Sequence, residues 1–188
     1  MRYPKPNAKA GLVMAGAAAA VGLVAGLAAR AGARGVAKAA EPLLGHWLDV
    51  IKTEHLEVLE AVEKLEATKP TATARRAALL NRIRLLLTRH AVEEENVLYP
   101  ALRLGEAEAE AMDLSAEHAT VKTALYELER MPAGDPGFKS RVRALRADLE
   151  SHMHREETEI FPALRQGLSP EEDERLTALL LRDGRMVS

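Results

Sequence analysis

Residues 90–105 read HAVEEENVLYPALRLG, and residues 152–167 read HMHREETEIFPALRQG, which is the same pattern 62 residues further along the chain. Each copy opens on a histidine, carries two glutamates four and five residues later, continues with an aromatic residue and closes on Pro-Ala-Leu-Arg-x-Gly. A second pair lies upstream, where TEHLEVLEAVEKLE (53–66) matches AEHATVKTALYELE (116–129) at an offset of 63 residues. The chain therefore contains one two-segment unit written twice.

Each segment has the composition and spacing of a helix. Ala, Leu, Glu and Arg dominate, aromatic residues make up only 3% of the chain, and apolar residues recur at three- and four-residue steps. The doubled hairpin with its short connections predicts an all-α protein, an antiparallel up-down-up-down four-helix bundle. We expect helices over 41–67, 72–99, 106–131 and 136–161, with a short C-terminal helix over 170–182.

Charge divides the chain into two parts. Residues 1–40 hold six of the 26 basic residues and none of the 28 acidic ones, so residues 41–188 carry a net charge of −8. A domain with this charge and few aromatic residues is a poor candidate for binding nucleic acid. The chain has no cysteine, which excludes disulfides, thiolate metal sites and cysteine nucleophiles.

The basic head, residues 1–40, is Ala/Gly-rich and contains an uncharged apolar run over 11–29. As a helix this run would approach the roughly 30 Å thickness of a bilayer core, although glycines and alanines make its insertion marginal. Three interpretations stay open: a membrane anchor, a signal peptide with small-residue cleavage options near Ala37, or a flexible arm. We expect a cytoplasmic or membrane-tethered protein, with the periplasm also open, and residues 41–188 as the bundle domain.

Polar side chains interrupt the apolar stripes of the second and fourth helices. His90 and Glu94 lie on the stripe of Leu79, Ile83, Leu86, Leu87 and Val97, and His152 and Glu156 lie on the corresponding stripe of the second copy. A buried carboxylate is costly unless a cation or hydrogen bonds compensate it. His55 and His118 add one imidazole from each of the other two helices. Four histidines and two glutamates converging inside a bundle are a ligand set for two transition-metal ions.

Other residues near these six receive weaker interpretations. His46 and His154 fall off the ligand stripe, so we expect them in solvent or behind the ligands. Glu95 and Glu157 recur in both copies, and they either orient imidazole N–H groups or face solvent as ordinary helix acids. Pro100 and Pro162 are expected to kink or end their helices. No chemical role follows from the spacing of Tyr99 or Phe161.

With these motifs, residues 41–167 resemble the hemerythrin-like family, also called HHE cation-binding domains. The resemblance implies two non-haem irons bridged by two carboxylates and an oxo or hydroxo group. It implies that His55 and His90 serve one iron, that His118 and His152 serve the other, and that Glu94 and Glu156 bridge the pair.

One departure from the oxygen-carrying members matters. Those proteins have a further histidine on the third helix and an aspartate on the fourth, whereas this chain has Lys122 and Glu156. The resemblance then leaves a vacant position on both irons, which argues against reversible oxygen storage. We expect a protein that binds or senses dioxygen, peroxide or nitric oxide. The alternatives are an oxidoreductase that consumes peroxide or nitric oxide with an unidentified redox partner, and a metal-free helical scaffold.

Overall fold

The computed structural model describes residues 46–132 and 134–184, and every regular element within these ranges is a helix. The expectations for residues 1–40, including the apolar run over 11–29, lie outside the described residues. None of the described helices combines the length and the apolar character needed to cross a bilayer. In chain order the elements are α2 (Trp47–Glu66), α3 (Thr73–Glu93), η1 (Glu94–Leu98), α4 (Tyr99–Leu104), α5 (Glu108–Arg130), α6 (Phe138–Arg155), η2 (Glu156–Ile160), α7 (Phe161–Gly167) and α8 (Pro170–Gly184).

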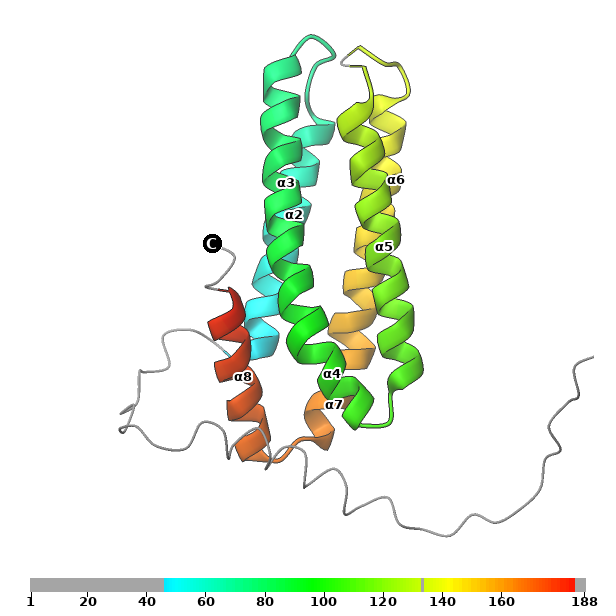
Figure 1. Ribbon diagram of the computed structural model, residues 1–188. Helices are drawn as coiled ribbons and strands as arrows, with labels where there is room; N and C mark the ends of the chain where they lie inside the picture. The colour runs from blue at the N-terminus through cyan, green and yellow to red at the C-terminus, as the bar shows by residue number, and fades with distance from the viewer. Residues whose placement is uncertain (1–45, 133, 185–188) are drawn as a thin grey trace, which may run out of the picture. The chain divides into compact units, whose positions relative to one another are not determined.

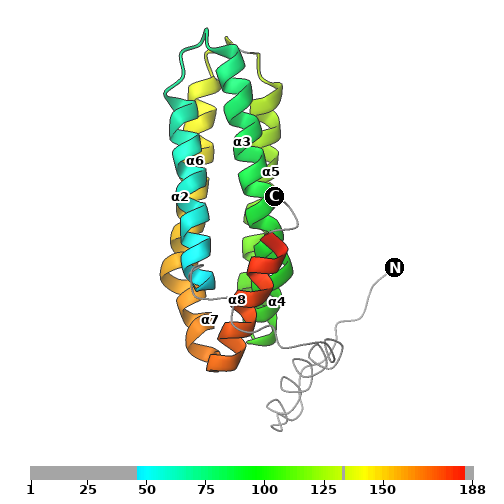
Figure 2. The ribbon, with the colours of Figure 1, turned by 90° about the vertical axis from the view of Figure 1, so that its left-hand side faces the viewer.

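The four long helices form the predicted antiparallel bundle (Figure 1). Helix α2 packs against α3 and α6, and α5 packs against the same two helices, so each hairpin of the repeat faces the other. Short turns join α2 to α3 and α5 to α6 at the same end of the bundle, as both ribbon views show (Figure 2). The prediction of an all-α four-helix bundle is confirmed.

Two helices run further than the sequence predicted. They were expected to end near residues 99 and 161, but the helical path continues through Pro100 to Leu104 and through Pro162 to Gly167. The five-residue π-helical turns η1 and η2 end at Leu98 and Ile160, two residues before these prolines. Each proline therefore lies in the first turn of a new α-helical segment, where its missing N–H needs no partner. The prolines restart the helices rather than end them.

Apolar side chains fill the bundle in two separate clusters. One, toward the α4 and α7 end, includes Ile51, Leu98 and Leu114. The other, toward the hairpin turns, includes Val58, Ile83 and Leu149. The histidines of the repeat occupy the levels between these residues on their helices, so a layer of polar side chains separates the two apolar clusters.

Helix α8 packs beside α2, α3 and η1. A reciprocal cap starts it, in which the Glu172 N–H donates to Ser169 Oγ (3.3 Å) and the Ser169 N–H donates to Glu172 Oε2 (2.9 Å). Leu180 is buried, and Asp173 accepts a hydrogen bond from Trp47 Nε1 (2.8 Å). Asp173 also pairs with His46, the N-cap residue of α2. His46 thus helps hold the C-terminal helix against the bundle, and the prediction of this helix is confirmed.

Candidate metal centre

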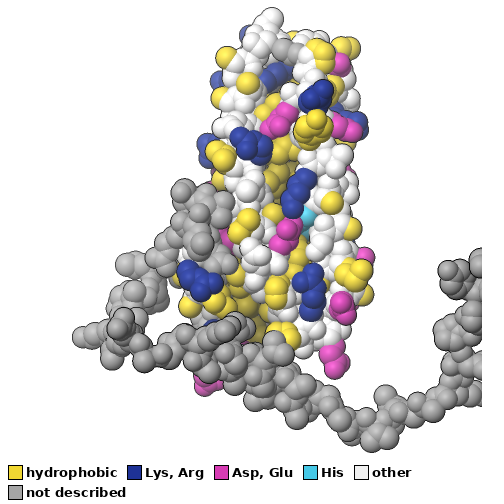
Figure 3. Space-filling view, in the orientation of Figure 1, with side chains coloured by type: hydrophobic (Ala, Val, Ile, Leu, Met, Phe, Trp, Pro, Cys, Tyr) yellow, Lys and Arg dark blue, Asp and Glu magenta, His cyan; other side chains and the backbone are white. Residues whose placement is uncertain are grey.

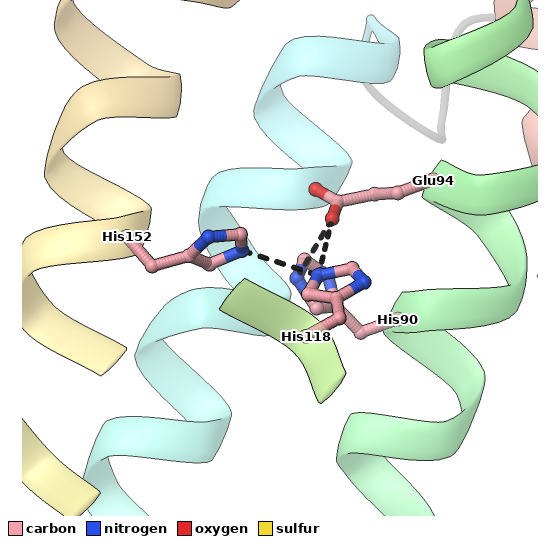
Figure 4. Close-up of side chains that lie close together, drawn as sticks. All are labelled: His90, Glu94, His118 and His152. Atoms are coloured by element: carbon pink, nitrogen blue, oxygen red, sulfur yellow. Dashed lines mark hydrogen bonds and ion pairs between the residues drawn. The ribbon is translucent and has the colours of Figure 1, made fainter. Parts of the chain in front are cut away.

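The structure brings all six predicted ligand residues into the polar layer. The layer contains one histidine from each of the four long helices and the first residue of each π-helical turn: His55 (α2), His90 (α3), Glu94 (η1), His118 (α5), His152 (α6) and Glu156 (η2). None is more than 5% exposed, and Glu94 and Glu156 are wholly buried. Figure 4 shows His118 between His152 and Glu94, with His90 beside it.

Imidazole Nε2 atoms and carboxylate oxygens face one another across this layer. Glu94 Oε2 lies 3.3 Å from His90 Nε2 and 3.2 Å from His118 Nε2. Glu156 Oε2 lies 3.3 Å from His152 Nε2 and 3.4 Å from His55 Nε2. The donor atoms fall into two overlapping groups, each with all its atoms within 4.8 Å of one another: His90, Glu94, His118 and His152, and His55, His90, Glu94 and Glu156.

A carboxylate holds the outer nitrogen of every one of these imidazoles. Glu157 lies 2.7 Å from His55 Nδ1, and Glu95 lies 2.9 Å from His118 Nδ1. Of the two interpretations of Glu95 and Glu157, the structure therefore supports imidazole orientation. Because Nδ1–H donates to a carboxylate, each Nε2 is left as the acceptor that a metal ion requires.

The other two imidazoles are held in the same way by glutamates that the sequence analysis did not assign. Glu54 lies 3.3 Å from His90 Nδ1, and Glu117 lies 2.8 Å from His152 Nδ1. The repeat contained a signal for both glutamates. Glu54 directly precedes His55 on α2, and Glu117 directly precedes His118 on α5, so the two glutamates occupy matching positions in the two copies. All four imidazole–carboxylate pairs thus obey the internal repeat.

The sequence also gave no indication that the Tyr99 side chain lies in the polar layer. Its hydroxyl donates to Glu94 Oε2 (3.0 Å) and lies 3.2 Å from both Glu156 Oε1 and His118 Nε2. Five residues along an α-helix turn about 500°, which places the side chain roughly 140° away from its starting direction. The π-helical turn between Glu94 and Tyr99 winds less per residue and reduces this offset, so the hydroxyl reaches the same cluster.

Burial controls the protonation of the imidazoles. It lowers the pKa of His90 well below its usual value, and the charges of His55, His118 and His152 act in the same direction. Burial also lowers the pKa of His152. For His55, burial lowers the pKa, but hydrogen bonds and charges from Glu156, Glu94 and Glu157 outweigh it, so the pKa is raised. Neutral His90 and His152 are in the form that binds metal.

Burial and the charge of Glu156 raise the pKa of Glu94 well above its usual value. Several inward atoms also lack a hydrogen bond to any of the described residues, namely His55 Nε2, His90 Nε2, Glu94 Oε1 and Glu156 Oε2. Buried polar atoms without partners are costly, and all four of these are metal donor atoms. The residues present therefore fit a site for metal cations.

A small cavity lies beside the histidines. Its volume is about 20 Å³, enough for one water or a diatomic molecule, and its surface is almost wholly apolar. Leu87 and Ala91 of α3 line it with Val121 and Lys122 of α5, Leu149 of α6, and His90, His118 and His152. Figure 3 shows apolar surface along the seam between α3 and α5, with histidine surface visible beside it.

Unlike the four histidines of the polar layer, His154 is exposed, as predicted.

Fold and site together define a class, the helical bundles whose interiors carry metal-binding side chains. Residues 46–164 match the family model described as the hemerythrin HHE cation binding domain. An uncharacterized hemerythrin-like protein of Schizosaccharomyces pombe is 30% identical over 142 residues, which cover 74% of this chain and 69% of that protein. The chain belongs to the hemerythrin HHE cation-binding domain family.

Two further relatives extend the comparison. A DNA nickase of a Nostoc species is 37% identical over 89 residues, which cover 47% of this chain but only 25% of that protein. The crystal structure of a hemerythrin HHE cation binding domain-containing protein of Mycobacterium kansasii shares the fold with a TM-score of 0.67. The matched region covers 77% of this chain and 88% of the Mycobacterium kansasii chain, at 24% sequence identity.

Proposed function

We propose that this chain is a non-haem di-iron protein that binds or senses a small ligand, namely dioxygen, peroxide or nitric oxide. The observation that carries the proposal is the set of four imidazoles whose outer nitrogens are each held by a carboxylate while their inner nitrogens face two buried glutamates. Such an arrangement leaves six donor groups directed at one small volume, and helical bundles with carboxylate and histidine ligands typically hold metal pairs.

In this proposal His55 and His90 hold one iron, and His118 and His152 hold the other. The ring centroids lie 4.8 Å apart within each of these two histidine pairs. Glu94 and Glu156 would supply carboxylate ligands to both irons, as the family resemblance implies. Imidazole and carboxylate donors suit several metals, so the choice of iron rests on the family resemblance as well as on the ligand types.

The pair of irons would supply one-electron and oxygen chemistry. The protein's own contribution is to orient the imidazoles, to exclude bulk water and to admit a molecule no larger than the apolar cavity beside His90 and His118. Dioxygen, peroxide and nitric oxide fit this size, and an apolar lining favours the two uncharged diatomic gases.

Metal analysis of protein from iron-replete cells tests the proposal. We expect about two irons per chain and near-ultraviolet charge-transfer bands that change on reduction and on exposure to nitric oxide. His90→Ala should abolish these bands. His154→Ala, which alters an exposed histidine two residues from His152, should retain them. Protein that folds without any bound metal would instead support a scaffold role.

Turnover distinguishes a sensor from an enzyme built on the same centre. A sensor changes its spectrum stoichiometrically with added ligand and then stops. Continuous consumption of peroxide or nitric oxide in the presence of a reductant would assign the oxidoreductase alternative.

A further inference from the structure

The Tyr99 hydroxyl lies inside the metal-binding cluster and has no counterpart in the second half of the repeat. Tyr99 is wholly buried, and its oxygen is 3.0 Å from Glu94 Oε2, 3.2 Å from Glu156 Oε1 and 3.2 Å from His118 Nε2. Phe161 occupies the matching position of the second copy and carries no polar atom on its ring. The ring of Phe161 packs edge-on against Trp47 instead, with centroids 5.7 Å apart.

The surroundings of this hydroxyl contain more acceptors than it can satisfy. His118 Nδ1 bonds to Glu95, so His118 Nε2 is an acceptor in the neutral imidazole. Tyr99 therefore faces three acceptors, two carboxylate oxygens and one imidazole nitrogen, with a single proton. That proton can be donated fully to only one of them. When both carboxyl groups are ionised, hydrogen bonding by this one proton accounts for one of the three short distances and leaves the other two as contacts between lone pairs.

Coordination to a shared cation accounts for all three distances. Neighbouring donor atoms of one octahedral ion, each bonded at roughly 2.1 Å, lie about 3 Å apart. The separations from the Tyr99 oxygen, 3.0 to 3.2 Å, match this spacing, and so does the 3.2 Å between the Nε2 atoms of His118 and His152.

We propose that Tyr99 is a seventh protein ligand of the metal centre and binds, through its phenolate oxygen, the metal ion that His118 and His152 hold. This inference rests on the proposed di-iron function. The O–H bond breaks when the oxygen binds, and the proton leaves to solvent. Tyrosine oxygen is an established ligand type for protein-bound iron. Before metal binds, burial and the charges of Glu94 and Glu156 raise the pKa of Tyr99, which keeps the hydroxyl protonated.

The two metal ions then differ. The ion of His118 and His152 gains an oxygen ligand from Tyr99, whereas Phe161 offers nothing to the ion of His55 and His90. The position left vacant for an external ligand belongs to the ion of His55 and His90. The apolar cavity is lined by His90 of that ion and by His118 and His152 of the other, so it touches ligands of both ions.

Resonance Raman spectroscopy of the iron-loaded, oxidised protein tests this ligand. Phenolate bound to ferric iron gives a visible charge-transfer band with enhanced tyrosine ring modes. We expect these modes in the wild type and in Tyr126→Phe, which alters an exposed tyrosine of α5, and we expect their loss in Tyr99→Phe. The iron content of each sample is measured first, so that loss of the band is distinguished from loss of metal.

A double variant keeps the test decisive if Tyr99→Phe fails to hold iron. The chain has three tyrosines, so Tyr3→Phe combined with Tyr126→Phe leaves Tyr99 alone. Persistence of the ring modes in this variant assigns them to Tyr99, and their loss overturns the assignment. Wild-type protein with its full iron but no phenolate modes also overturns the inference while leaving the di-iron function intact. Wild-type protein without iron refutes both.

Discussion

Glu94→Gln should act in opposite directions on the metal-free and the metal-loaded protein. Glu94 is wholly buried, its Oε1 atom has no hydrogen bond within residues 46–132 and 134–184, and the charge of Glu156 lies in the same layer. Glutamine has nearly the same volume and can still accept the hydrogen bond from Tyr99. The substitution therefore removes a buried charge and retains the packing, which should stabilise the metal-free bundle.

The expected gain follows from the cost of the atom that is relieved. An unpartnered buried polar group costs about 1–3 kcal/mol and a charged one costs more, and Glu94→Gln replaces a charged group with a neutral amide at the same place, so we expect a gain of about 2 kcal/mol. For a domain of this size, each kcal/mol shifts the melting temperature by roughly 2–4 °C, so about 2 kcal/mol corresponds to about 4–8 °C. In metal-loaded protein the sign reverses, because a neutral amide is a weaker ligand than a carboxylate and the variant loses metal-linked stabilisation.

The pH dependence gives the prediction a second signature. Burial raises the folded-state pKa of Glu94 well above 4.5, so the wild-type residue is protonated in both states at low pH and costs nothing there. Its penalty grows as the pH rises above about 4.5, where the unfolded state ionises, and is complete above the folded-state pKa. The advantage of Glu94→Gln should therefore be largest at neutral pH and should vanish below about 4.5.

Urea unfolding followed by circular dichroism, on chelator-treated and on iron-loaded protein, measures these differences. Glu150→Gln is the matched control, because Glu150 lies exposed on α6 beside Arg146 and its substitution should change the free energy of unfolding by less than about 0.5 kcal/mol. A metal-free Glu94→Gln protein that is no more stable than the wild type would refute the claim that this carboxylate strains the bundle until a cation binds.

Three further predictions follow from the same layer. Glu117→Gln should weaken metal binding about 10–100-fold in competition with a chelator, because it loosens the Nδ1 contact of His152, while the helical circular dichroism spectrum stays unchanged. Val121→Phe should fill the cavity and slow nitric oxide binding to iron-loaded protein at unchanged iron content; an unaffected rate would mean that ligands enter elsewhere. In metal-free protein, the stability of the wild type relative to His90→Gln should fall as pH drops below 6.5, because the unfolded state takes up a proton that folded His90, with its lowered pKa, does not. Urea unfolding on either side of that pH checks it, and a constant difference would contradict the assigned pKa shift.

The fold was predictable because the two-segment helical unit occurs twice in the sequence. Helix breaks at the prolines and glycines placed the third helix within two residues of α5 at each end, and the cap at Ser169 placed the start of α8. The ends of the second and fourth helices were wrong for a physical reason. A proline normally stops a helix, and nothing local in the sequence showed that a π-helical turn before Pro100 and Pro162 would let each helix continue.

The residues of the polar layer were predictable to the extent that they follow the α-helical period. His90 with Glu94, and His152 with Glu156, lie four residues apart and share a face, so the stripe located them. Glu54 and Glu117 point between helices, and one helix period cannot show which imidazole on a neighbouring helix they contact. Tyr99 was invisible to the same method, because it reaches the layer only through the change of period at η1.

The repeat also explains where the symmetry of the site ends. The four imidazole–carboxylate pairs are two kinds of pair that each occur twice, because they depend only on helices that both halves possess. Helix α8 has no counterpart in the first half, and it joins Trp47, Tyr99 and Phe161 in one apolar cluster. At that end of the bundle Phe161 packs on Trp47, whereas the Tyr99 hydroxyl enters the polar layer. Two identical halves would hold two equivalent metal ions. The Tyr99 hydroxyl, which only the first copy of the repeat supplies, would make one ion of the pair different from the other.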